Sequence, residues 1–259
     1  MRPHFFVIMD ATRIALALGL GLTAALANVL GGFFVVRRNW SRQYLKYFLA
    51  LGSGFMLGVV FLDIVPESTR LVGIDSAMLC LLAGYFLIHL FEHTLVPHFH
   101  FGEEIHTHEL AHETGLAPHH AGMSALFGLI IHTFFDGVAI ASGFLVSVWL
   151  GWVIFLAIFL HKLPEGFAIS SLMLATGRSK KSSLWAAVIL GAATIAGVLL
   201  MGAMRSEVQY ALPLSGGVTL YVAASDLIPE VNREPGVRIA MLVFFGLALI
   251  FLVHRIFHV

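Results

Sequence analysis

The stretch 132–140, HTFFDGVAI, is matched in pattern by the stretch 161–169, HKLPEGFAI. Both follow His-x-x-x-acid-Gly-x-Ala-Ile, and both lie in segments apolar enough for the interior of a membrane. An ionisable residue at the bilayer centre costs roughly 2.5–3.5 kcal/mol on insertion scales. A duplicated set at that depth needs a compensating partner, and a bound metal ion is the partner that His and carboxylate side chains suit best.

The composition places the chain in a membrane. Hydrophobic residues make up 59% of its 259 residues and charged residues only 12%, whereas about a quarter of a soluble globular chain is charged. Lys and Arg balance Asp and Glu, 15 against 15, without the basic clusters that bind nucleic acid. The single cysteine, Cys80, excludes an internal disulfide and a thiolate metal site. A metal site must therefore use His and carboxylate ligands.

Apolar segments of about 20 residues, the length that crosses a bilayer, recur along the whole chain. We predict an all-α membrane protein in which residues 1–259 form a single transmembrane domain. The first segment is longer than the core of a signal peptide and has no clear cleavage site, so we interpret it as a retained span. The eight predicted spans cover residues 11–36, 47–66, 74–95, 122–146, 149–174, 183–204, 208–230 and 237–257.

The distribution of Lys and Arg predicts how these spans are oriented. Basic residues gather after spans 1, 5 and 7, whereas the loops after spans 2, 4 and 6 hold only Arg70 and Arg205. By the positive-inside rule, the loops after odd-numbered spans are cytoplasmic. We therefore expect a multi-pass protein of the plasma or inner cell membrane, with both termini outside the cytoplasm.

Prolines mark where several spans should end, and one proline lies inside a span. Pro66, Pro97 and Pro229 fall near predicted helix ends. Pro164 lies within span 5, where it cannot donate a hydrogen bond to Leu160 and tends to kink the helix. We predict a kink there that either serves helix packing or opens carbonyl groups toward a site.

A second motif also occurs twice. Asp63-Ile-Val-Pro-Glu67 in span 2 and Asp226-Leu-Ile-Pro-Glu230 in span 7 share Asp-x-x-Pro-Glu. The first copy lies near the outer face and the second near the inner face, as an inverted repeat would place them. We predict a 3 + 2 + 3 layout, with spans 1–3 and 6–8 as inverted halves around spans 4 and 5. The four acids are candidates for the entrance and exit of an ion path, or else ordinary solvated or loop-pairing groups at helix ends.

The two His-x-x-x-acid pairs predict a metal site at the membrane midplane. His132 and Asp136 lie one helical turn apart on one face, as do His161 and Glu165. Together they supply two nitrogen and two oxygen ligands, which suit Zn²⁺ and other first-row divalent ions. The Gly that follows each acid would let a neighbouring helix approach closely. The alternative is that each pair only hydrogen-bonds a neighbouring helix, but this gives no reason for the equal spacing.

Histidines concentrate before span 4. We expect residues 96–121 to form a His-rich cytoplasmic loop that binds metal weakly or senses it, although a disordered linker with incidental His is the alternative. His89, Glu92 and His93 at the end of span 3 could extend an exit from the pore. The loop candidates for metal binding are His98, His100, His106, His108, His112, His119 and His120.

These features together resemble the ZIP (Zrt/Irt-like) family of divalent metal transporters. The resemblance rests on His132-x-x-x-Asp136-Gly and His161-x-x-Pro-Glu165-Gly in spans 4 and 5 of an eight-span chain with a His-rich third loop, and it covers essentially the whole chain. It implies that these four ligands form the primary metal site. It further implies uptake of Zn²⁺, or of Cd²⁺, Fe²⁺, Mn²⁺ or Co²⁺, toward the cytoplasm along a path between spans 2, 4, 5 and 7. A homodimer in the lipid bilayer is also implied, with the metal as substrate and neither a cofactor nor an enzyme activity.

Two positions depart from the family pattern. Many members have Asn directly after the first His and an acid directly after the first span-5 ligand, and these side chains help to form a second metal site. Thr133 and Lys162 stand there in this chain, and an ammonium group cannot ligate an ion unless it is deprotonated. We therefore predict one metal ion, with the charge of Lys162 in place of the second cation. The alternative is that Lys162 turns away from the site and snorkels.

Three other functions remain open at this point: an intramembrane metallohydrolase, a metal exporter, and a metal-sensing receptor, for which the sequence shows no output domain. An intramembrane metallohydrolase would also bury a metal, but no His-Glu-x-x-His motif lies within a predicted span, and four protein ligands leave no obvious position for water. A metal exporter with paired His and Asp ligands would be expected to have fewer spans and a soluble metal-binding domain. Metal-dependent hydrolysis of a membrane substrate would favour the first of these.

Overall fold

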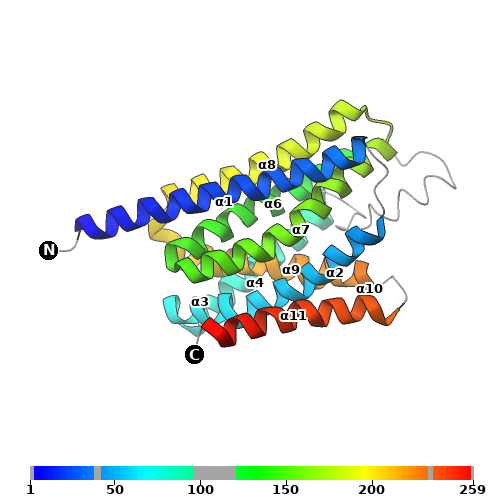
Figure 1. Ribbon diagram of the computed structural model, residues 1–259. Helices are drawn as coiled ribbons and strands as arrows, with labels where there is room; N and C mark the ends of the chain where they lie inside the picture. Colours follow the sequence, from blue (N-terminus) through cyan, green and yellow to red (C-terminus); the bar gives the residue numbers. More distant parts are fainter. Residues whose placement is uncertain (1–2, 38–41, 96–120, 233–235, 258–259) are drawn as a thin grey trace.

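The structure is a computed structural model that describes residues 3–37, 42–95, 121–232 and 236–257, and its regular elements there are all helices (Figure 1). Eight of the described helices are long and apolar enough to cross a membrane, as predicted. The elements are α1 (Pro3–Arg37), α2 (Arg42–Val59), η1 (Val60–Ile64), α3 (Val65–Val72), α4 (Ile74–Leu95), α6 (Ala121–Val146), α7 (Val148–Ala175), α8 (Lys180–Ala203), η2 (Arg205–Glu207), α9 (Val208–Tyr221), η3 (Val222–Leu227), α10 (Ile228–Asn232) and α11 (Val237–Phe257).

The helices run back and forth along one direction, so the loops gather at two ends of the bundle (Figure 1). One group contains α1, α6, α7 and α8, which pack against one another. In the rest of the bundle, α2 packs on α11 and α4 packs on α9. The two sets meet chiefly where α2 contacts α7 and where α9 contacts α6. The central pair α6 and α7 is therefore surrounded by other helices, which is the arrangement that a buried site needs.

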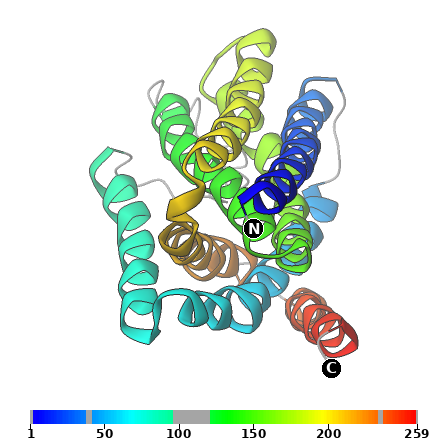
Figure 2. The same cartoon turned by 90° about the vertical axis from the view of Figure 1, so that its left-hand side faces the viewer.

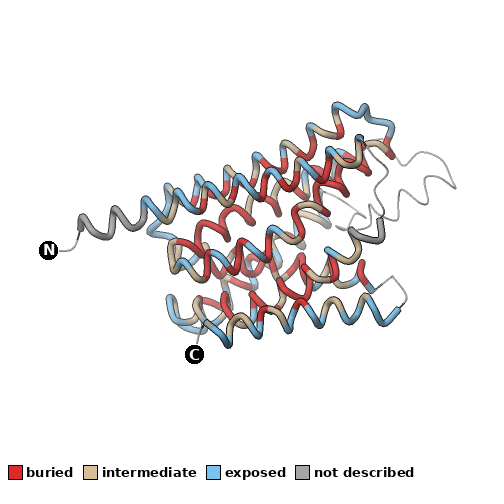
Figure 3. The backbone as a smooth tube through the Cα atoms, in the orientation of Figure 1, coloured by how far each residue is buried: buried red, intermediate tan, exposed pale blue. Residues whose placement is uncertain are grey.

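Burial confirms which helices face the centre and which face lipid. In the most apolar stretch of each span, 78% of the residues of α7 are buried, whereas the buried share is 22% for α4 and 11% for α11. Figure 3 shows the buried residues along the middle of the bundle, and Figure 2 shows α4 and α11 at its periphery. The exposed side chains of α11 include Phe244, Phe245 and Phe251. An apolar outer surface of this kind suits a multi-pass membrane protein, because lipid tails are its solvent.

Two spans continue past the prolines at which we expected them to end. The helix that contains Pro66 runs on to Val72, and the one that contains Pro229 runs on to Asn232. Proline cannot donate to the carbonyl four residues earlier, which interrupts the normal α-helical ladder. In both spans a π-helical segment, η1 or η3, precedes the proline and provides hydrogen bonds that reach five residues back. These prolines therefore lie inside their spans.

The boundaries of α7 follow from its capping residues. The Ser147 hydroxyl accepts a hydrogen bond from the Leu150 N–H at 3.1 Å and caps the first turn. At the other end Gly177 has a φ of 79°, and the Arg178 N–H donates to the Met173 carbonyl at 3.0 Å. This is a Schellman ending, which favours glycine because of the positive φ. Pro164 lies inside the helix, as predicted.

Candidate metal centre

The predicted metal ligands from α6 and α7 meet at one point. One ligand atom each from His132, Asp136, His161 and Glu165 lie within 4.8 Å of one another. All of these side chains are buried, with residue exposures of 3% or less. The i, i+4 spacing puts each pair on one face of its helix, and packing of α6 against α7 then brings the two faces together. The arrangement can hold a divalent ion with two nitrogen and two oxygen ligands.

Asp136 lies at the centre of the ligand group. Its Oδ2 atom is 3.2 Å from His132 Nε2 and 3.3 Å from His161 Nε2. His161 Nε2 is also 3.9 Å from Glu165 Oε2. The other ring nitrogen of His161, Nδ1, lies 3.2 Å from the Ala157 carbonyl. Because a carbonyl can only accept, this contact suits the tautomer with a proton on Nδ1, in which the Nε2 lone pair is left for a metal ion.

Lys162 points into this group of ligands. Its Nζ lies 2.6 Å from Asp136 Oδ2 and 2.6 Å from Glu165 Oε2, and the residue has no exposed surface. The alternative in which Lys162 turns away and snorkels is therefore wrong. An ammonium group between two buried carboxylates neutralises charge that would otherwise be very costly in this environment.

Thr133 also contacts the carboxylate of Glu165. Its hydroxyl donates a hydrogen bond to Glu165 Oε1, and Lys162 Nζ donates to Thr133 Oγ1 at 3.4 Å. The two residues that depart from the family pattern therefore both hold Glu165, one through each of its oxygens.

The glycine after each acid permits backbone contact with a neighbouring helix. A Cβ at Gly137 would overlap the carbonyl oxygen of Thr194 on α8, and a Cβ at Gly166 would overlap that of Asn28 on α1. Close approach of this kind is a common use of glycine between membrane helices. The Gly of the repeated pattern therefore serves packing of α8 on α6 and of α1 on α7.

The acids of the Asp-x-x-Pro-Glu motifs lie away from this centre in environments of their own. Asp63, Asp226 and Glu230 are buried, so the alternative of ordinary solvated groups is wrong for these three. Glu67 is half-buried and pairs with Arg70 at 2.9 Å. Each Asp lies in a π-helical segment, Asp63 in η1 and Asp226 in η3.

The structure describes the end of α4 but not the predicted metal-binding loop. Glu92 accepts a hydrogen bond from the Tyr221 hydroxyl at 2.8 Å. The His89 and His93 rings have centroids 4.1 Å apart. The loop candidates His98, His100, His106, His108, His112, His119 and His120 lie outside the described residues.

One polar contact was missed at the level of the sequence. His254 near the end of α11 places Nδ1 3.2 Å from Asp63 Oδ1. Its position in an apolar span beside Arg255 gives no local signal of this partner, because Asp63 is far away in the chain. Only the packing of α11 on α2 brings the two together.

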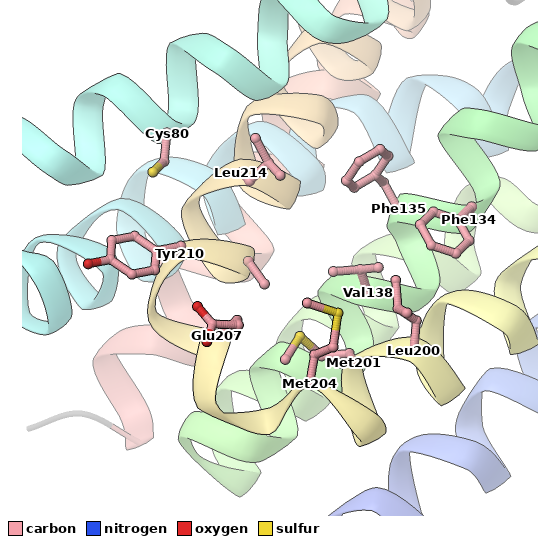
Figure 4. A pocket seen from close by; sticks show the side chains of 11 residues that line it. Cys80, Phe134, Phe135, Val138, Leu200, Met201, Met204, Glu207, Tyr210 and Leu214 are labelled. Carbon is pink, nitrogen blue, oxygen red and sulfur yellow. The ribbon is translucent and has the colours of Figure 1, made fainter.

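A separate apolar cavity of about 420 Å³ lies between α4, α6, α8 and α9 (Figure 4). Phe134, Phe135, Met201 and Met204 line it, and Glu207 is its only ionisable carboxylate. Its lining also includes the Cys80 thiol, but it has no histidine and no second carboxylate among the described residues, so it lacks the ligand set of the central site. This cavity is therefore not a candidate metal site.

Comparison with known proteins identifies the family. The sequence profile described as ZIP zinc transporter matches residues 100–254, which is more than half of the chain. The chain belongs to the ZIP zinc transporter family. The matched region contains both His-x-x-x-acid pairs and the second Asp-x-x-Pro-Glu motif. The eight spans and the buried ligand group thus occur in a member of this family.

Named relatives differ in how much of their length the chain covers. The zinc transporter ZupT of Corynebacterium aurimucosum is 27% identical over 242 residues, which is 87% of this chain and 90% of ZupT. The zinc transporter foi of Drosophila melanogaster is 26% identical over 107 residues, 40% of this chain but 15% of foi. The human zinc transporter SLC39A7 is 27% identical over 129 residues, 46% of this chain and 28% of SLC39A7. The chain thus spans far less than two thirds of foi and SLC39A7.

Proposed function

We propose that this protein carries divalent transition-metal ions, zinc first among them, across the membrane toward the cytoplasm. The ion binds at one midplane site formed by His132, Asp136, His161 and Glu165. The observation that carries this proposal is the convergence of these buried ligands from α6 and α7. Membership in a family of zinc transporters, and relatives that carry that name, support zinc as the substrate.

The charges at the site suit binding followed by release. With Asp136 and Glu165 ionised, both His neutral and Lys162 charged, the site carries −1 when empty and +1 with a divalent ion. Neither state is far from neutral, so neither suffers the full cost of charge in a membrane interior. A site without the lysine would carry −2 when empty and would hold a divalent ion more tightly.

Asp136 can serve the ion and Lys162 together. Its Oδ2 atom faces Lys162, while its Oδ1 atom has no hydrogen-bond partner among the described residues. An ion that binds through Oδ1 leaves the Lys162 contact in place. One carboxylate thus holds the resident ammonium and the transported ion at the same time.

The position of Lys162 leads us to propose a single ion per protomer. Lys162→Asp would replace the ammonium by a carboxylate at the position where many relatives have an acid. We expect this variant to bind a second ion, measured as Zn²⁺ or Cd²⁺ per protomer in detergent. Unchanged stoichiometry together with unaltered transport would show that Lys162 does not take the place of a cation.

Glycine contacts support the proposed inverted repeat. A Cβ at Gly54 would overlap the backbone of Val243 on α11, and a Cβ at Gly217 would overlap the backbone of Leu81 on α4. Gly54 and Gly217 precede the Asp of their own Asp-x-x-Pro-Glu motif by the same number of residues. Equivalent residues of the two motifs thus meet equivalent helices.

Helix pairing follows the same symmetry. α1 packs on α7 as α8 packs on α6, and α2 packs on α11 as α9 packs on α4. The contact of α2 with α7 likewise corresponds to the contact of α9 with α6. These pairs support a 3 + 2 + 3 architecture in a single transmembrane domain with its site between inverted halves. Such halves can exchange conformations and so alternate which side is open.

Flux through proteoliposomes tests the function directly. We expect uptake of Zn²⁺ by the unaltered chain, with Cd²⁺, Fe²⁺, Mn²⁺ and Co²⁺ as competitors, and at least a tenfold loss in His132→Ala and Glu165→Ala. Glu207→Ala, which removes an exposed carboxylate outside the site, is the control. Retention of full flux in both site variants would overturn the assignment of the site.

A metallohydrolase is a weaker candidate. The pattern His-Glu-x-x-His does occur at residues 108–112, but these lie outside the described residues and outside the spans predicted from the sequence. Family membership favours a transporter, and Lys162 takes the space beside the carboxylates that a reactive water would need.

A homodimer in the lipid bilayer remains part of the proposal, and crosslinking in membranes would test it.

A further inference from the structure

A small cavity of about 150 Å³, lined by both polar and apolar side chains, lies at the end of the bundle where the loop between α6 and α7 is found. Asp63 and Glu67 line it from η1 and α3, and His254 lines it from α11. Trp149 and Leu150 at the start of α7 form another part of its wall. The cavity therefore brings together residues from three membrane spans, of which α7 also carries two ligands of the central site.

We propose that His254 and Asp63 form a second divalent-cation site, which captures the metal at the extracytoplasmic mouth of the path. This inference rests on the proposed function and orientation, and it adds α11 to the helices that handle the ion. Glu67 contributes negative charge to the same cavity. The chemical class of the ligand is a first-row divalent ion such as Zn²⁺.

The separation of the two ligand atoms suits an ion between them. His254 Nδ1 and Asp63 Oδ1 are 3.2 Å apart, the same separation as between His132 Nε2 and Asp136 Oδ2 in the central site. Two ligand atoms about 2.0–2.1 Å from one tetrahedral zinc lie roughly 3.3 Å from each other. An ion can thus bind with only a small movement of either side chain, and water can complete its coordination.

Exposure differs sharply between the two ligands. The side chain of His254 is 32% exposed, whereas that of Asp63 is 3% exposed. An ion bound by both residues therefore has one ligand that is accessible from the surface, His254, and one that is buried in the bundle, Asp63. This is the geometry of a transfer site, which receives a hydrated ion and presents it to a buried path.

Charge in the cavity favours a cation but keeps its binding weak. Asp63 and Glu67 carry −2 together, and Arg70, which pairs with Glu67 at 2.9 Å, reduces the sum to −1. The Arg70 side chain is 78% exposed. Because exposed ion pairs contribute little free energy, Arg70 can separate from Glu67 at little cost. A site of one histidine and one carboxylate, with water completing the coordination, releases its ion readily, as a site on a transport path must.

The inverted repeat gives this site a counterpart at the opposite end. Gly246 of α11 and Gly84 of α4 would each, with a Cβ, overlap the backbone of the helix they pack on. His254 follows Gly246 by the same number of residues as Glu92 follows Gly84. A side chain that can ligate metal thus occupies equivalent positions on both peripheral helices. The histidine is the outer member of this pair and the carboxylate is the inner one.

A thiol-protection experiment tests the site without any measurement of transport. The variant His254→Cys, in a Cys80→Ser background, is labelled with a membrane-impermeant maleimide in sealed cells or spheroplasts. Because a thiolate ligates zinc, we expect saturating Zn²⁺ to slow labelling at least tenfold. Asp63→Asn in the same background should reduce that protection to less than twofold. Arg255→Cys, one residue further along α11, is the control and should show no protection.

Further arms separate this site from the central one. Protection of His254→Cys should persist when His132→Ala disables the central site, so the inference can stand even if the proposed transport fails. Absence of protection, or equal protection with Asp63→Asn, would reduce the pair to a structural hydrogen bond and overturn the inference. Labelling from the cytoplasmic side alone would overturn its assignment to the outer mouth.

Transport kinetics give a second, independent readout. In the otherwise unaltered chain, His254→Gln keeps a polar contact to Asp63 but loses the metal-binding nitrogen. We expect the Zn²⁺ concentration for half-maximal uptake to rise at least threefold while the maximal rate is unchanged. A lower maximal rate with an unchanged half-saturation would indicate a structural role and contradict the capture site.

Discussion

Lys162 on α7 and Asp136 on α6 form a fully buried ion pair, with 2.6 Å between Nζ and Oδ2. The pair joins the two central helices at the same carboxylate that faces both histidines of the candidate site. Breaking a buried pair by removing one partner is costly, because it leaves charge without compensation. The carboxylates of the candidate site are thus held in place by a cation that belongs to the protein itself.

Removal of the lysine charge should destabilise the protein in the absence of metal. We expect Lys162→Met to lower the free energy of unfolding by about 3–5 kcal/mol, because Asp136 and Glu165 lose their shared counter-charge. Thermal unfolding in detergent measures this, and added Zn²⁺ should recover more stability in the variant than in the unaltered chain. Lys180→Met, at an exposed position in the first turn of α8, is the control. Equal stability of the two variants would contradict a structural role for the buried pair.

Loss of the central carboxylate should abolish most metal binding and uptake. Asp136→Asn keeps the size of the side chain but removes the charge that faces His132, His161 and Lys162. Changes even outside the direct ligands typically cost 10–100-fold in metal affinity, so we expect at least a tenfold weaker Zn²⁺ affinity by calorimetry. Glu207→Gln, which changes an exposed carboxylate away from the site, should leave affinity unchanged. Wild-type affinity in Asp136→Asn would remove this residue from the ligand set.

A methyl group on the glycine after the second acid should disturb the fit between two helices. Gly166→Ala would push a Cβ into the backbone of Asn28 on α1, and overpacking of this kind typically costs about 1–3 kcal/mol. Gly19→Ala is a matched control in α1, since a Cβ there meets nothing within 4 Å. Melting temperatures of the two purified variants should separate them clearly. If both melt like the unaltered chain, the close contact of α1 with α7 is not required.

Deletion of residues 98–120 should change regulation more than transport itself. We expect basal Zn²⁺ uptake to persist while its dependence on metal concentration shifts, because the composition of the deleted segment predicts weak metal binding by its histidines and acids. Uptake measured over a range of Zn²⁺ concentrations checks this. Replacement of the segment by a Gly/Ser linker of equal length controls for the altered connection. Complete loss of uptake with that linker would contradict the regulatory interpretation.

Much of the fold could be predicted because a membrane restricts the choices. Lipid requires every backbone group to be satisfied within its own span, so eight apolar segments of sufficient length had to become eight helices. The turns around Pro66 and Pro229 could not be predicted in this way. A proline at either position is compatible with a helix end or with a π-helical bypass, and the choice depends on whether neighbouring helices support the continued span.

The candidate ligands could also be predicted, because they depend only on residue spacing within one helix. The spacing of His132 from Asp136, and of His161 from Glu165, places each pair on one helical face whatever the rest of the chain does. The direction of Lys162 is different, because a long flexible side chain on a helix can turn toward either a site or an interface with water. Its contact with both carboxylates depends on how closely α6 and α7 approach.

The sequence by itself determined the number of spans, the two ligand pairs and the glycines beside them, since each depends on hydropathy or on spacing within one helix. Only the tertiary structure decided that Lys162 lies between the carboxylates and that His254 meets Asp63. Both contacts join residues on different helices, and the sequence pattern of one helix does not predict how closely another helix approaches it. Packing of whole spans therefore creates the electrostatic environment in which the local motifs act.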